Sequence, residues 1–316
     1  MIETQEDIKS GVRRRQFNTS YEESKFLIVD IEFGGFGAMI ARRKLGLQLG
    51  LYFNRCVLFR NNRYVYDDPF KPESKFSLSD IAGERLVKMD FTEQQEKVVY
   101  FDFNSYWENK VILAEYQEKT VDNLDFRLFS GMLLNSLELK DEYASFVEQK
   151  DKEIGISSRS QPLLGVHVRR GDKEVDTPFI SIERYATEIR SILRKMGGSS
   201  IFLCSDDSRV VTQLTEQLKD VQILYDANET RYDSKANNLS FVTSSKKRRD
   251  EESMTGIKVI ELLSRCDHVL GQSNVQFAKL AGCKLMDRTN NTSVMTLIDP
   301  ITNQTCDWED FSLSLK

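Results

Sequence analysis

The feature that most constrains the fold is a regular alternation of short apolar runs and helical patterns in the second half of the chain. Apolar residues fill Leu163–Val168, and helical spacing follows over Ile182–Met196. Later apolar runs lie at residues 201–204, 221–225, 268–270 and 284–286, and helical patterns lie at 208–218, 255–265 and 275–281. Strand–helix alternation at this spacing predicts a right-handed, doubly wound parallel sheet that binds its ligand at the carboxyl ends of the strands.

The first half of the chain begins with a unit of the same type. An apolar run over residues 26–31 leads into a cluster of glycines that includes Gly35 and Gly37, and a helical pattern and a second apolar run follow. This order predicts a strand–loop–helix–strand unit. The cluster does not match the dinucleotide-binding pattern in register, so it indicates only a close approach of the backbone to a ligand or to the other domain.

Two α/β domains joined near the polar segment 155–161 account for these patterns. We expect a polar, loosely packed tail over residues 1–24, an N-terminal α/β domain over 25–158 and a C-terminal Rossmann-like domain over 159–316. Residues 226–253 are polar and predict a long loop, whose charge block at 246–252 favours a solvated segment over a lid or an acceptor contact.

Composition narrows the class of protein. The net charge of −5 gives no reason to expect a nucleic-acid partner. The N-terminal residues lack the apolar core of a signal peptide, and no apolar stretch is long enough to predict a membrane span. The five cysteines show no paired spacing, which favours reduced thiols and a cytoplasmic location. The oligomeric state is not indicated.

The segment GVHVRRGDK at residues 165–173 carries the clearest chemistry. Arg169 and Arg170 follow directly on a buried strand, and a glycine beside them lets backbone approach a ligand. Three cations at this point suit a diphosphate, because arginine pairs with phosphate through two parallel hydrogen bonds. The competing interpretation is a solvated basic loop that is paired with Asp172.

His167 lies two residues before Arg169 and so points to the same face of the sheet. Alone it would indicate a core histidine, but here it is a candidate ribose or base contact.

Acidic residues end the next strand. Asp206 and Asp207 are candidates to bind ribose hydroxyls or to cap the helix that follows, and both roles are open to adjacent aspartates. A metal site is disfavoured because no further ligands stand at recognisable spacing and the chain has only 2 histidines.

Several segments together resemble the α1,6-fucosyltransferase family, which has animal and rhizobial branches. GVHVRRGDK is similar to the H-V-R-R-x-D-K signature of the animal branch, and PFISIERY follows at nearly the family spacing. CSDDSRV, CDHVLGQSNVQFAKLAG, GGFGAM and the Phe70–Pro72 element are similar to further family segments. The similarity runs from about residue 26 to residue 285, and its most specific part is the arginine motif.

The resemblance implies a GT-B-like fold of two Rossmann-like domains that face a cleft. It also implies inverting, α1,6-like transfer of L-fucose from GDP-fucose to a hydroxyl of a glycan acceptor, by analogy a GlcNAc-containing one. It implies no metal and no cofactor, with the acceptor on the N-terminal domain and the nucleotide sugar on the C-terminal domain. The donor-binding residues that it implies, together with those expected from the patterns above, are Gly35, Gly37, His167, Arg169, Arg170, Asp172, Tyr185, Asp206, Asp207, Ser273 and Gln276.

The implied catalytic residues are Arg170, Lys173 and a carboxylate base. The loop after the arginines is one residue shorter than in the family, so Asp176 aligns with the family's base and Glu174 competes with it. A second departure lies in the predicted helix 255–265, where Val259 aligns with a nucleotide-binding aspartate and Glu261 is a possible substitute. An inverting transferase for another nucleotide sugar and a non-catalytic GDP- or glycan-binding protein are the alternative functions.

Overall fold

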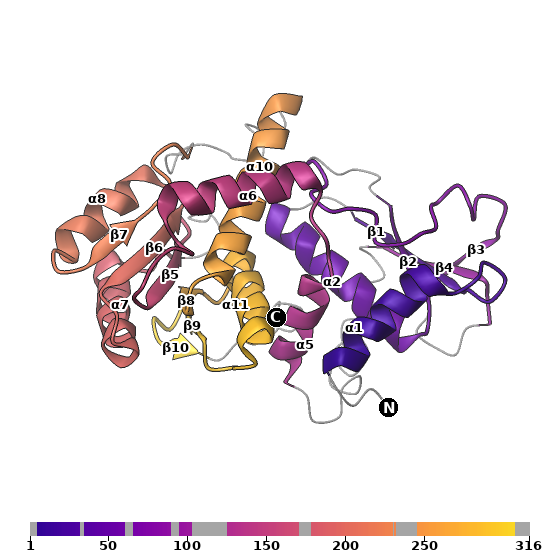
Figure 1. Cartoon of the computed structure of the whole chain (residues 1–316), viewed down its shortest axis with the longest axis horizontal. Coiled ribbons are helices and arrows are strands. Elements are labelled where there is room, and N and C mark those ends of the chain that lie inside the picture. The colour runs from indigo at the N-terminus through magenta and orange to yellow at the C-terminus, as the bar shows by residue number, and fades with distance from the viewer. Residues whose placement is uncertain are drawn as a thin grey trace. The chain divides into compact units, whose positions relative to one another are not determined.

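A computed structural model describes residues 5–31, 35–60, 66–89, 95–102, 125–170, 178–229, 231 and 245–306 of the chain (Figure 1). The chain divides into two compact units, with unit 1 running to Leu139 and unit 2 beginning at Lys140. Each unit is built on its own parallel sheet.

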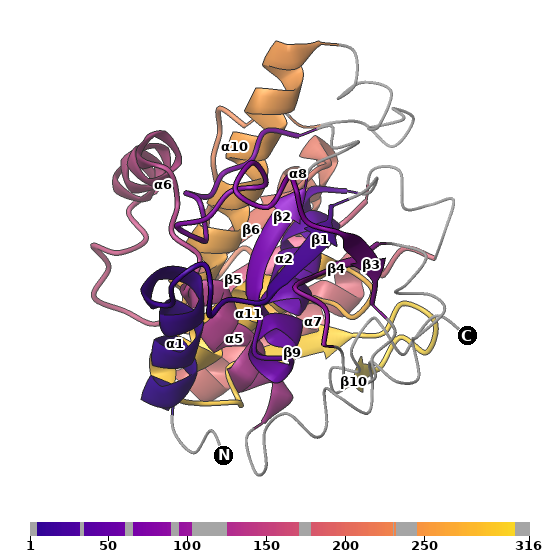
Figure 2. The same ribbon diagram turned by 90° about the vertical axis from the view of Figure 1, so that its right-hand side faces the viewer.

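Unit 1 contains a four-stranded parallel sheet in the order β2-β1-β4-β3, which Figure 2 shows side by side. Its described elements are α1 (Gln5–Arg13), η1 (Arg14–Asn18), β1 (Phe26–Asp30), α2 (Phe36–Tyr52), β2 (Cys56–Arg60), β3 (Leu86–Lys88), β4 (Val98–Phe101) and α5 (Phe126–Asn135). All five residues of β1 are buried, as expected for a central strand covered on both faces. Helix α2 packs against β1 and β2 and also contacts α1 and α5.

The N-terminal segment is not the loose tail that its polarity predicts. Helix α1 buries Ile8 and Val12, and the side chain of Gln16 is 2% exposed. The Gln16 amide donates to the carbonyl of Val57 at 3.0 Å and accepts from the Val57 N–H at 2.7 Å, so it pairs with β2 as a neighbouring strand would. The same amide also donates to the carbonyl of Glu73 at 3.0 Å. One buried amide that satisfies three backbone groups holds the segment in place, a contact that the local sequence does not reveal.

Unit 2 contains a six-stranded sheet in the order β10-β9-β8-β5-β6-β7, which is parallel apart from the β9–β10 pair. Its described elements are α6 (Asp141–Ile154), β5 (Leu163–Val168), α7 (Ile182–Met196), β6 (Ser200–Ser205), α8 (Ser208–Gln217), β7 (Gln222–Leu224), α10 (Lys246–Ser264), β8 (His268–Gln272), α11 (Gln276–Thr289), β9 (Met295–Ile298) and β10 (Thr305–Cys306). The chain passes from β5 to β6 on one side and later returns to β8 on the other. The carboxyl end of β5 is therefore the switch point of a doubly wound sheet.

Helices cover both faces of this sheet (Figure 1). Alternate β5 residues pack with α7 and α8 in one hydrophobic core. On the opposite face, α11 contacts β5 and β8 and also packs against α10, which contacts β5.

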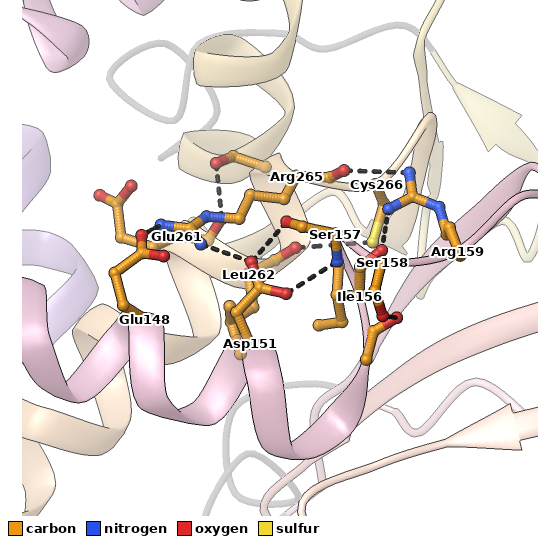
Figure 3. Close-up of polar contacts among 12 residues, drawn as sticks. Glu148, Asp151, Ile156, Ser157, Ser158, Arg159, Glu261, Leu262, Arg265 and Cys266 are labelled. Carbon is orange, nitrogen blue, oxygen red and sulfur yellow. Dashed lines mark hydrogen bonds and ion pairs between the residues drawn. The ribbon is translucent and has the colours of Figure 1, made fainter.

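Helix α6 lies against α10, where Arg265 pairs with Glu148 and Asp151 (Figure 3). Asp151 also accepts from the backbone N–H of Ser157 at 2.7 Å and from its hydroxyl at 2.5 Å. These contacts attach α6 to unit 2. The unit boundary at residues 139/140 therefore precedes α6, whereas the glycine-containing segment 155–161 had indicated a boundary after it.

Helix α5 begins after Asp125, whose carboxylate accepts from the Arg127 N–H at 2.8 Å. Two local predictions need correction. Helix α10 begins within the predicted loop 226–253, because the side chain of Ser245 caps its first turn. Residues 284–286 continue α11 rather than forming a strand, and their apolar members, Leu285 and Met286, are fully buried within this helix.

Candidate active site

The candidate site lies where the three central strands of unit 2 end. Parallel neighbours β8, β5 and β6 end together, which places Gln272, Arg169 and Asp206 at one edge of the sheet. The Arg169 N–H donates to Gln272 Oε1 at 3.1 Å, and the Arg170 N–H donates to Asp206 Oδ1 at 2.8 Å. Side chains from both neighbouring strand ends thus fix the backbone of the arginine pair. Gln272 is a member of this site that the sequence reasoning missed.

The two arginines have different partners. The Arg169 guanidinium pairs with Asp206, with 2.7 Å between Nη1 and Oδ2. The Arg170 guanidinium donates to the carbonyl of Ile180 at 2.9 Å and stacks over the ring of Phe179, 4.7 Å from its centroid. Among the described residues no carboxylate forms an ion pair with Arg170, although its side chain is half-buried and this burial lowers its pKa. A partly desolvated cation that forms no ion pair with a described carboxylate favours an anion bound beside it.

His167 lies inside the fold immediately before this edge. Its ring stacks on Phe277 of α11, with centroids 5.4 Å apart and planes at 4°. Burial, with a contribution from Arg169, lowers the pKa of His167 from 6.5 to about 3. Its Nδ1 has no hydrogen-bond partner in the described part of the chain. The imidazole is therefore neutral, with one buried nitrogen available to a ligand.

Tyr185 of α7 contacts the backbone of β5 just before the arginine pair. The residue is fully buried, and its hydroxyl donates to the backbone carbonyl of His167 at 3.4 Å. Burial raises the pKa of the phenol, so it stays protonated. Its position on α7 indicates that it holds β5 in place rather than presenting a polar group at the surface.

The adjacent aspartates have different contacts, and only capping, one of the two roles expected for them, is seen in the described structure. Asp206 contacts both arginines, as described above. Asp207 is the N-cap of α8, where its Oδ1 accepts from the Arg209 N–H at 2.9 Å. Burial acts to raise the pKa of Asp207, but the bonds from Arg209 outweigh it and hold the pKa below the ordinary range. Capping is therefore the role that the geometry gives to Asp207.

Ser273 and Gln276 follow β8 at the same edge. The Ser273 N–H donates to the carbonyl of Ile298 at 3.0 Å, and Gln276 is the first residue of α11. Helix α11 approaches β8 closely here, because an added Cβ on Gly271 would lie 2.2 Å from the Cβ of Ala278. Both predicted residues are therefore close in the chain to Gln272, which contacts Arg169.

The other predicted residues do not join this cluster in the described structure. Gly35 precedes α2 and Gly37 lies within it, so both belong to unit 1. Apart from its two chain neighbours, no described residue has an atom within 4 Å of a Cβ built on Gly35. The remaining predicted residues, Asp172, Lys173, Glu174 and Asp176, lie outside the described residues.

The two positions that departed from the family pattern also have defined places in α10. Val259 is 5% exposed and apolar. Glu261 pairs with Lys284 of α11 at 3.0 Å, so its charge is already neutralised there.

Within the described ranges no three or more His, Cys, Asp or Glu side chains form a group that could hold a metal ion. No described helix combines the length and the apolar character that crossing a bilayer requires.

Comparisons with known proteins bear on both the sequence and the fold. Residues 125–293 match the family described as α-(1,6)-fucosyltransferase N- and catalytic domains. An α-(1,6)-fucosyltransferase of Drosophila melanogaster is 30% identical over 129 residues, which are 38% of this chain and 19% of that protein. The chain thus matches about a fifth of the length of this relative.

Solved structures extend the similarity to both units. NodZ α-1,6-fucosyltransferase soaked with GDP-fucose superposes with a TM-score of 0.56 and 12% identity, covering 91% of this chain and 100% of that one. A NodZ structure from Bradyrhizobium gives 0.54 and 13%, with 91% and 100% covered. A variant of Arabidopsis thaliana FUT1 in complex with GDP gives 0.51 and 11%, with 89% and 72% covered. The fold is therefore that of the GT-B fucosyltransferases. Since the family model spans more than half of the chain and includes the whole arginine site, the chain belongs to the α-(1,6)-fucosyltransferase family.

Proposed function

We propose that the protein transfers L-fucose from GDP-fucose to a hydroxyl group of a glycan acceptor, with inversion at the anomeric carbon and without a metal ion. The observation that carries this proposal is the half-buried Arg170 guanidinium, which has no carboxylate partner among the described residues. A nucleoside diphosphate would supply the missing negative charge.

The proposed chemistry follows from where charge develops. The acceptor oxygen bonds to the anomeric carbon of fucose while the bond from that carbon to the β-phosphate oxygen breaks, so negative charge grows on departing GDP. Arg169 and Arg170 are held in advance by Asp206 and Ile180, so they stabilise that charge without rearranging. A carboxylate takes the acceptor proton, and we assign this role to Asp176, with Glu174 as the competing candidate.

The donor and the metal requirement are tested together. Purified protein is incubated with GDP-fucose and a panel of chitooligosaccharides, with and without a chelator, and the products are weighed by mass spectrometry. We expect a fucosylated product at the same rate in both conditions. Transfer only from another nucleotide sugar would refute the donor assignment, and GDP binding without turnover would indicate a non-catalytic protein.

The arginine assignment has a matched control. Arg170→Ala is expected to lower turnover by on the order of a hundredfold or more, as the loss of a donor to transition-state charge does. Arg190→Ala removes an arginine from α7 whose side chain is 44% exposed and donates to the carbonyl of Gln217, and it should leave turnover unchanged. Equal rates for the two variants would contradict the role of Arg170.

The proton acceptor is identified by a pair of variants. Asp176→Ala should abolish transfer while GDP binding persists, and Glu174→Ala should retain transfer. The reverse result would give the role to Glu174.

We also propose a reducing, cytosolic location, which is supported by five free cysteines, four of them buried.

A further inference from the structure

The two arginines of the candidate site are held by groups of different charge. The Arg169 guanidinium pairs with the carboxylate of Asp206, so its positive charge is balanced within the chain. The Arg170 guanidinium is held by two neutral groups, the ring of Phe179 and the backbone carbonyl of Ile180. The face of an aromatic ring attracts a cation without neutralising it. These neutral contacts therefore hold Arg170 while leaving it its full charge.

The carboxylates near Arg170 are paired with other arginines. Burial lowers the pKa of Arg170, although the charges of Asp207 and Asp206 act to raise it. Asp206 Oδ2 lies 2.7 Å from the Arg169 guanidinium, and Asp207 Oδ2 lies 2.5 Å from that of Arg209. In the described part of the chain, the contacts that hold the side chain of Arg170 are thus the two neutral ones.

Phe179 can orient the guanidinium because its own backbone is fixed. The next residue, Ile180, is 3% exposed and packs in the core formed by β5, α7 and α8. Ser181 is the N-cap of α7, where its hydroxyl accepts from the Arg184 N–H at 3.2 Å. The ring centroid of Phe179 lies 4.7 Å from the guanidinium carbon of Arg170. A ring on such a backbone restricts a long side chain that would otherwise sample many rotamers.

The orientation of the Arg170 guanidinium matters because most of its N–H groups do not contact the chain. Among the described residues only Ile180 accepts a hydrogen bond from this guanidinium, through Nη2 at 2.9 Å. Arginine binds phosphate most strongly through two parallel N–H groups, whose directions are set by the plane of the guanidinium. A side chain that fixes this plane therefore controls how well Arg170 meets a phosphate.

We propose that Phe179 is a positioning residue for fucosyl transfer, whose ring orients the guanidinium of Arg170 towards the departing diphosphate without reducing its charge. This inference rests on the proposed function, since it assumes that GDP departs beside Arg170. Negative charge on the β-phosphate is greatest once the bond to fucose is breaking. Loss of the ring should therefore lower turnover more than it lowers the affinity for GDP.

Phe179→Leu tests the proposal, because leucine keeps an apolar side chain at this position but has no aromatic face. We expect kcat to fall about tenfold, the rate equivalent of one partly desolvated cation–π contact, and GDP affinity in calorimetry to fall about threefold. Phe179→Tyr retains the ring and should keep kcat within about threefold of the wild-type value. Phe17→Leu is the matched control, since that ring lies in unit 1 and is 43% exposed, and it should leave kcat unchanged.

A double-mutant cycle separates positioning from a purely structural role. In the Arg170→Ala background, Phe179→Leu should lower neither kcat nor GDP affinity further, because the ring then has no guanidinium to orient. The GDP affinities complete the cycle if the residual turnover of Arg170→Ala is too slow to measure. Damage to the fold would instead lower both quantities by the same factor with and without Arg170.

That additive result would overturn the proposal, and so would a wild-type kcat in Phe179→Leu or equal losses in Phe179→Leu and Phe179→Tyr. Each of these outcomes leaves fucosyl transfer by the wild-type protein intact. Failure of the wild-type protein to transfer fucose from GDP-fucose would instead refute the proposed function and this inference together.

Discussion

Replacing Gly271 by alanine tests the close packing on which the candidate site depends. Gly271 lies in β8, beside Gln272, whose side chain accepts the Arg169 N–H. A Cβ at this position would lie 2.2 Å from the Cβ of Ala278 in α11, and Ala278 is fully buried. Carbon atoms in contact are normally separated by about 3.5–4.0 Å, so the substitution forces β8 and α11 apart by more than about 1 Å.

The size of the effect follows from these contacts. Gly271→Ala is expected to lower the free energy of unfolding by about 3 kcal/mol, at the upper end of the range for overpacked cores. Ala278→Gly should cost about 2 kcal/mol, of which half is helix propensity and half is the lost buried methyl group. In the double variant the new methyl group occupies the vacated space, so only about 1 kcal/mol remains lost. The two substitutions are thus coupled by about 4 kcal/mol.

Urea unfolding followed by circular dichroism measures these values, and calorimetry measures GDP affinity beside them. Affinity should fall in Gly271→Ala, because Gln272 moves with β8, and should recover in the double variant. Gly83→Ala is the control, since an added Cβ there meets no described residue within 4 Å beyond its chain neighbours. This substitution should change stability by less than about 0.5 kcal/mol. A stable Gly271→Ala protein, or a double variant no more stable than Gly271→Ala, would refute the reasoning.

Three further substitutions or conditions have expected outcomes. Burial is the main cause that lowers the pKa of His167 to about 3 and of His268 to about 4, both from 6.5. The unfolded chain therefore binds more protons below pH 6.5, and the free energy of unfolding should fall by about 2 kcal/mol per histidine between pH 6.5 and 5. Denaturant titrations of the wild type and of His268→Gln at several pH values check this. The free energy of unfolding should fall less with pH in His268→Gln, and an equal fall in both proteins would contradict the prediction. Arg265→Met leaves the 3% exposed carboxylate of Asp151 without its cation, so stability should fall by about 3 kcal/mol. Adding Asp151→Asn should recover part of that loss in thermal unfolding, and no recovery would argue against the ion pair. Asp207→Ala removes the cap of α8 and should cost about 1 kcal/mol, whereas Asp207→Asn should stay within about 0.5 kcal/mol of wild type. Equal losses in the two Asp207 variants would show that capping is not the main role of this residue.

Local patterns predicted the elements that position the site. The apolar run Leu163–Val168 and the helical spacing over Ile182–Met196 match β5 and α7. A strand buried on both faces is apolar throughout, and a helix buried on one face has apolar residues at helical spacing, so both show directly in the sequence. The position of Arg169 and Arg170 after β5 followed from the same hydrophobic pattern. The start of α10 was missed because its first turns are charged and exposed, and their helical state depends on the Ser245 cap.

Contacts between distant segments could not be predicted from local sequence patterns. The pairing of Gln16 with β2 joins residues 41 positions apart, and that of Lys258 with Asp226 joins residues 32 positions apart. Neither pair has a local signal, because hydrogen bonds and ion pairs depend on which strand ends and helices the topology brings together. For the same reason Gln272 could not be assigned to the arginine site before the strand order was known.

The sequence by itself determined the family, the doubly wound character of the second half and the arginine pair at a strand end, since these depend on local periodicity and on a specific motif. Only the tertiary structure decided that Asp206 holds the backbone of one arginine and the side chain of the other, while Arg170 keeps its charge without a carboxylate partner among the described residues. Charge pairing is a property of the distances between elements, and those distances are set when the strands associate into a sheet.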